Sequence, residues 1–103
     1  TDFIIMGDGN VGIGTTSPND ILHLSSLGNP KIRVEDTTSN KYVQMGHGDN
    51  YATFNAQGST AYWFQTDGDT KMTILSGGNV GIGTTSPTAK LDVQNGGVNI
   101  YLG

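Results

Sequence analysis

The ten-residue word GNVGIGTTSP occurs twice in this chain of 103 residues, at positions 9–18 and 78–87, with no difference between the copies. The copies lie 69 positions apart, and their flanks agree at the same offset. The matching apolar residues are Ile5 with Ile74, Leu22 with Leu91 and Leu24 with Val93. A repeated unit of this kind predicts an array along an axis rather than one closed globule.

The composition sets a second constraint, because glycine is abundant and apolar side chains are scarce. Glycine accounts for 16 of the 103 residues, roughly twice the ~7% that is usual, and apolar residues account for 34%. Each glycine loses more backbone entropy on ordering than another residue would. We therefore expect the chain to bury its apolar surface against copies of itself, and the strong β pattern argues against disorder.

Charge and cysteine content exclude several classes of partner. The net charge is −4 and no basic run occurs, so we expect no nucleic-acid partner and no attraction to an anionic membrane. No apolar stretch is long enough for a membrane-spanning helix, so we expect no membrane insertion. The chain does not open with a basic segment followed by an apolar one, so we expect no signal peptide. The absence of cysteine rules out disulfides and thiolate zinc sites.

Short alternating segments separated by turn signals predict an all-β meander with no sustained helix. We divide the chain into a first repeat segment (1–24), a β-meander module (25–77) and a second, truncated repeat segment (78–103). Within both copies of the word, the Ser-Pro pair predicts a capped single helical turn.

Two glycine-rich motifs suggest ligand binding but are better explained as turns. GDGNVG at 7–12 fits a dinucleotide-binding pattern, yet IGTTSP follows it where that pattern requires a helix. DGD at 67–69 lacks the distant glutamate of a calcium loop, so we expect a hairpin turn there. No nucleophile elbow occurs, and Glu35 and Asp36 point to opposite faces of a strand. We therefore expect no enzyme activity and no cofactor.

The segment GNVGIGTTSPTAKLDV (78–93) resembles the stalk repeats of tailed-bacteriophage tail fibres and tailspikes, and the first copy follows the same pattern. KIRVEDTTSNKYVQMG and TKMTILSGGNVGIG resemble the segments between such repeats. The resemblance implies an intertwined homotrimeric β-fibre, of triple β-helix or β-prism type, that serves as a structural or receptor-binding part in host attachment. It also implies a place in the virion outside the cell, with other virion proteins and a host-surface glycan or protein as partners.

Together with the alternation, the resemblance places one set of apolar side chains in the trimer core. These residues are Val11, Ile13, Leu22, Leu24, Val80, Ile82, Leu91 and Val93. The glycines between them are expected to let neighbouring chains approach closely. His23 on the trimer axis would then offer three imidazoles to a metal ion.

Two other functions remain open from the sequence. Exposed aromatic residues can stack on sugar rings, and Trp63, Tyr62 and Tyr51 are the candidates for glycan contact in a carbohydrate-binding β-module. In AYWFQ, Tyr62 and Phe64 share one face of the strand and Trp63 takes the other. A trimeric bacterial surface adhesin would have similar physical requirements.

Overall fold

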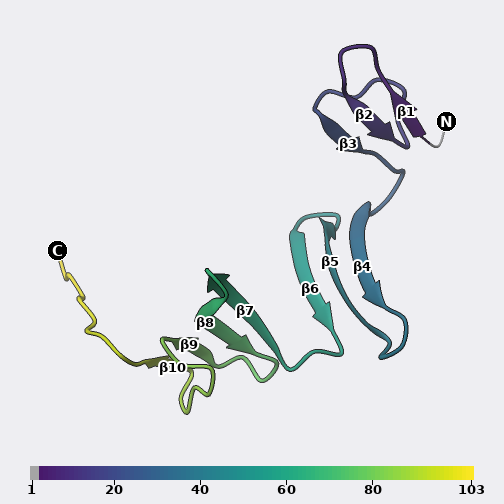
Figure 1. Ribbon diagram of the computed structural model, residues 1–103. Coiled ribbons are helices and arrows are strands. Elements are labelled where there is room, and N and C mark those ends of the chain that lie inside the picture. The colour runs from purple at the N-terminus through teal and green to yellow at the C-terminus, as the bar shows by residue number, and fades with distance from the viewer. Residues whose placement is uncertain (1–2) are drawn as a thin grey trace. The chain divides into compact units, whose positions relative to one another are not determined.

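The computed structural model describes residues 3–103, which form ten short strands in three small open sheets and no helix (Figure 1). The strands are β1 (Phe3–Ile5), β2 (Val11–Ile13), β3 (Leu22–Leu24), β4 (Lys31–Asp36), β5 (Lys41–His47), β6 (Ala52–Gln57), β7 (Ala61–Thr66), β8 (Asp69–Leu75), β9 (Val80–Ile82) and β10 (Leu91–Val93). The all-β prediction is confirmed.

The first sheet has the order β1-β2-β3 and combines two kinds of pairing. β1 and β2 are antiparallel, joined by a turn in which the Met6 amide donates to the Asn10 carbonyl at 2.8 Å. β2 and β3 are parallel, and the segment 14–21 that connects them has eight residues. Parallel neighbours usually require a dozen or more connecting residues, so this crossover is unusually tight.

The third sheet has the order β10-β9-β8-β7 and repeats this arrangement at the 69-residue offset. β8 and β9 are antiparallel, as β1 and β2 are, and β9 and β10 are parallel, as β2 and β3 are. β7 adds an antiparallel fourth strand through Asp67 and Gly68, whose φ angles are 51° and 84°. Two consecutive positive φ angles are typical of a two-residue hairpin turn, so the predicted DGD hairpin is confirmed.

The crossover explains one pair of glycines in the repeated word. Gly12 and Gly81 are buried at the centres of β2 and β9, with the TTSP segment folded over them. A Cβ at Gly12 would lie 2.5 Å from the Thr15 carbonyl oxygen, and one at Gly81 would lie 2.5 Å from that of Thr84. The close approach that excludes a side chain here is therefore made within one chain, whereas the sequence analysis assigned it to neighbouring chains.

The crossover also needs glycine where it leaves the strand. Gly14 has a φ of 80° and Gly83 a φ of 76°. A Cβ on either residue would overlap the carbonyl oxygen of the residue that follows the parallel partner strand, Ser25 or Gln94. Only glycine meets both the conformational and the steric requirement.

The predicted helical turn at the Ser-Pro pairs is wrong. The segments after Pro18 and Pro87 form bends, and threonine supplies the local cap. The backbone N–H groups of Ser17 and Ser86 donate to the hydroxyls of Thr15 and Thr84, each at 3.1 Å. A hydroxyl that accepts from the amide two residues ahead stabilises a turn instead of starting a helix.

The second sheet has the order β4-β5-β6 and contains no copy of the word. Its strands are joined by the four-residue segments 37–40 and 48–51, which are long enough only for antiparallel neighbours. Asn40 closes the first of these turns with a φ of 56°. At the second turn, the Gly48 amide donates to the Tyr51 carbonyl at 2.7 Å.

The chain divides into two compact units, one of residues up to 36 with 42–55, the other of residues 37–41 with 56–103. The first unit holds the first sheet and nearly all of the second, and the second unit holds the third sheet. The first repeat segment, 1–24, ends with β3, and its first two residues lie outside the described part. β7 and β8, which belong to the 25–77 segment of the sequence analysis, pair within the third sheet.

Apart from Pro87, no apolar side chain is buried among residues 3–103. Thr73, in the middle of β8, is the largest side chain of the described part that is fully covered. Burial of apolar surface is the main favourable term in folding. The three sheets therefore expose, in a single chain, the surface that would normally stabilise them.

Replacing Gly81 with alanine should destabilise the third sheet by about 1–3 kcal/mol, because the added methyl meets the Thr84 backbone. Urea unfolding followed by circular dichroism measures the loss. Gly77→Ala is the matched control, since a Cβ there has no neighbour within 4 Å and the first copy carries Asp8 at that position. Equal unfolding of the two variants would contradict the packing described here.

Candidate functional site

The third sheet carries two continuous apolar rows on one face. Cross-strand partners share a face of a sheet, so the strand registers define the rows directly. One row crosses the sheet as Tyr62, Ile74, Val80 and Leu91, and the other as Phe64, Met72, Ile82 and Val93. Leu91 is 62% exposed and Ile82 45%, so this face is open in the single chain.

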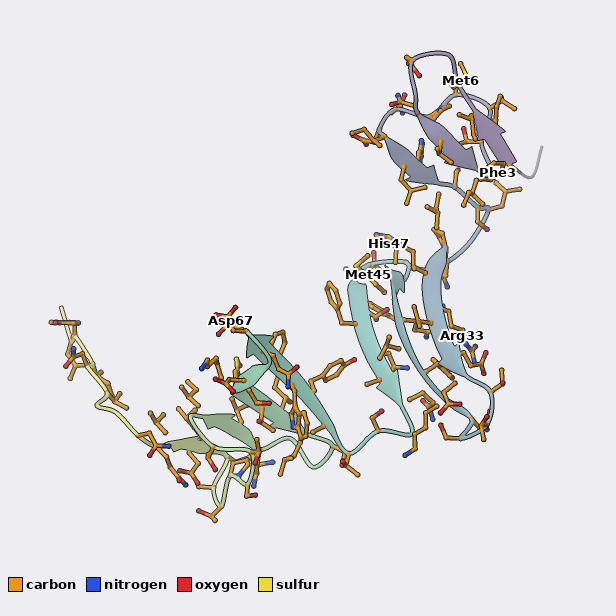
Figure 2. The ribbon with its side chains drawn as sticks, in the orientation of Figure 1. Phe3, Met6, Arg33, Met45, His47 and Asp67 are labelled. Carbon is orange, nitrogen blue, oxygen red and sulfur yellow. The ribbon has the colours of Figure 1, made fainter. Side chains whose placement is uncertain are left out.

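The first sheet carries the same two rows with one strand fewer. Ile5, Val11 and Leu22 form one row, and Phe3, Ile13 and Leu24 form the other. Figure 2 labels Phe3 on this sheet. All eight residues predicted for a trimer core therefore lie in these rows, four on each repeat sheet.

The second sheet also has an apolar face, although it lacks the repeat. Arg33 stacks on Tyr42 with 3.5 Å between the guanidinium carbon and the ring centroid, so these two side chains share the polar face. By strand alternation the opposite face is apolar. That face carries Ile32, Val34, Val43, Met45 and Phe54, all of them exposed.

Six members of the rows were not among the predicted core residues. These are Phe3 and Ile5 in the first sheet and Tyr62, Phe64, Met72 and Ile74 in the third. Alternation placed each on one face of its own strand, but membership of a row depends on register. The sequence did contain one indication of the missed residues, because the 69-residue offset aligns Ile5 with Ile74.

The middle of the other face of each repeat sheet is closed by its own chain. In the third sheet, Trp63, Thr73, Gly81 and Asp92 lie in one row on that face, and the crossover after β9 covers Gly81. Pro87 of the crossover is buried. The apolar face of each repeat sheet has no such cover, and this indicates packing against another chain.

The three candidate glycan contacts are not gathered in one site. Tyr62 lies in an apolar row, and its hydroxyl is buried with no hydrogen-bond partner in the described structure. Trp63 is on the opposite face of β7 and is 59% exposed. Tyr51 belongs to the turn between β5 and β6, in the other unit of the chain.

His23 makes a local contact on the closed face of the first sheet. The Asn19 backbone N–H donates to His23 Nδ1 at 3.3 Å. The equivalent residue in the second repeat is Asp92, whose Oδ2 accepts the Thr88 backbone N–H at 2.9 Å. The two side chains thus have the same role. No group of three metal-ligating residues occurs within residues 3–103.

Hydrogen bonding lowers the pKa of Asp92. The Thr88 backbone N–H is the main cause, and the Gln94 side-chain amide, 3.1 and 3.2 Å from the two carboxylate oxygens, adds to it. Both donors stabilise the charged form.

Comparison with known proteins adds no family to this description. The chain matches no model of a protein family, and a search of curated proteins finds no match either. Residues 3–103 include no helix of the length and apolarity needed to cross a bilayer.

The low pKa of Asp92 predicts an acid-sensitive second repeat. Because the folded state binds the proton less readily than the unfolded state, the stabilisation is present in full above roughly pH 4 and falls as the pH drops further. The free energies of unfolding of the parent and of Asp92→Asn, compared at pH 7 and at pH 3, measure this stabilisation. We expect the variant to be less stable at pH 7 and the gap to shrink at pH 3. A gap independent of pH would contradict this role.

Exchanging the two side chains provides a further prediction. His23→Asp should stabilise the first repeat by about 0.5–1.5 kcal/mol at pH 7, because a charged carboxylate accepts the Asn19 amide more strongly than a ring nitrogen does. His23→Asn is the control, an uncharged acceptor of similar size to aspartate. Urea unfolding measures the stability of both variants. A His23→Asp variant no more stable than His23→Asn would contradict the equivalence of His23 and Asp92.

Proposed function

We propose that this chain is a structural module of a homotrimeric fibre. In this proposal it forms a receptor-binding or stalk part of a tailed-bacteriophage tail fibre and serves in host attachment. The observation that carries the proposal is the pair of matching apolar faces on the two repeat sheets, left open while no apolar side chain except that of Pro87 is buried in the described chain. The resemblance of the repeated word to fibre stalk repeats supports the same role.

The repetition of the open faces favours copies of this chain as the partner. A foreign partner would need two matching surfaces with the same spacing, whereas a second and third copy aligned in register provide them automatically. Full burial of a Leu, Ile or Val side chain is worth about 1.5–3 kcal/mol relative to exposure. The fourteen side chains of the rows therefore supply a large part of the stability that a single chain lacks.

This role requires no catalysis and no cofactor, and it places the chain in the virion, outside the cell. Sedimentation or light scattering measures the molar mass. We expect three times the 10.8 kDa of one chain. A folded species of 10.8 kDa would instead favour a monomeric carbohydrate-binding module and refute the fibre proposal.

Ile82→Asp should abolish assembly, because a carboxylate would enter the apolar row of every chain. Burying an unpaired charge costs several kcal/mol per ion. Thr85→Asp is the matched control: it adds the same charge on the exposed crossover of the same repeat. We expect Thr85→Asp to keep the trimer mass and Ile82→Asp to lose it. A trimeric, equally heat-resistant Ile82→Asp would show that this face does not lie inward.

A further inference from the structure

A hollow of about 450 Å³ lies at the end of the second sheet where β5 turns into β6. Figure 2 labels His47 at this end of β5. The polar part of its lining comes from the loop before β4 and from all three strands, and consists of Asn29, Lys31, Gln44, His47, Thr53 and Asn55. Tyr51, from the turn, also lines the hollow.

The ring of Tyr51 lies against Gly48, where a side chain would leave it no room. Gly48 is buried, and a Cβ there would lie 2.7 Å from Cε2 and 2.9 Å from Cζ of the Tyr51 ring. The Gly48 amide closes the turn on the Tyr51 carbonyl at 2.7 Å. Tyr51 is nevertheless 64% exposed, so much of its aromatic ring is open to solvent.

The Thr53 hydroxyl donates to the Gly46 carbonyl at 3.5 Å, whereas the other polar groups of the hollow are free to bind a ligand. The side-chain amides of Asn29, Gln44 and Asn55 make no hydrogen bond within the described structure, and Lys31 forms no ion pair there. No carboxylate lines the hollow. The site therefore combines the aromatic ring of Tyr51, several side-chain amides that each offer a donor and an acceptor, and the ammonium group of Lys31 without a counter-charge.

We propose that this hollow binds a saccharide that carries a carboxylate. The polarised C–H groups of a pyranose ring pack against the negative face of Tyr51. The amides of Gln44 and Asn55 bridge neighbouring hydroxyls, since each amide offers both a donor and an acceptor. Lys31 pairs with the carboxylate in a charge-assisted hydrogen bond. Trp63 and Tyr62, the other two candidate glycan contacts, take no part.

The inference rests on the proposed function in one respect, the accessibility of the hollow in the assembled fibre. Gln44 alternates with Val43 and Met45 along β5, so it points away from the apolar face of the second sheet. Assembly through the apolar faces leaves the polar face outward. The polar lining of the hollow then stays open in the trimer, while Phe54, which also lines the hollow, lies on the apolar face.

The test is calorimetric titration of the full chain with a glucuronate-containing oligosaccharide and with its uncharged glucose counterpart, alongside the molar mass of each variant. We expect binding of the acidic sugar that weakens with salt. Tyr51→Ala should weaken it roughly tenfold or more, whereas Tyr51→Phe keeps the ring and the affinity. Gly48→Ala should weaken it with the ring still present, and Lys31→Gln should remove the preference for the acidic sugar.

The outcomes separate this inference from the proposed function. A trimer that binds neither sugar, or that binds equally with and without the Tyr51 ring, overturns the saccharide site and leaves the assembly intact. Equal affinity for both sugars in the parent overturns the carboxylate assignment. A monomer that binds the acidic sugar with the expected variant pattern supports the site and refutes the assembly.

Discussion

The fold of each repeat depends on one close approach, that of the TTSP crossover to the glycine in the middle of the preceding strand. At 2.5 Å from the threonine carbonyl there is no room for a Cβ, so the strand has no side chain at its centre on that face. The crossover in turn covers that face with residues of the same chain. The apolar rows lie on the opposite face, which the crossover cannot cover, and this is why the high glycine content and the unburied apolar rows occur together.

The repeated word and its flanks are held by different constraints. Within the word, Asn10 and Asn79 donate from their side chains to the proline carbonyls at 3.5 and 3.4 Å, in addition to the threonine caps and the glycines. Most positions of the word thus make a specific local contact or need a glycine, and this explains why the two copies have the same residues. In the flanks, only a property is retained: Leu24 is replaced by Val93, and the ring nitrogen of His23 by a carboxylate that accepts the same amide.

Alternation in the sequence was sufficient to predict the strands, the DGD hairpin and the two faces of each repeat strand. It did not predict the parallel pairing of β2 with β3 and of β9 with β10, because eight residues without a helix are not a usual parallel connection. The cap was also misassigned, since serine before proline is a common helix start and the hydroxyl of Thr15 competes with it locally. Phe3 and Met72 join the rows only through register, which no single strand encodes.

The difference between the repeat sheets and the second sheet explains where a ligand site arises. The repeats use their second face for the crossover, and this consumes the surface on which a ligand would bind. The second sheet contains no crossover, so its polar face retains Gln44, Asn55 and Lys31 with unused hydrogen-bonding capacity. In the proposed fibre, the two tasks would be separated along the chain: the repeat sheets would supply the surfaces for assembly, and the second sheet between them would supply the ligand site.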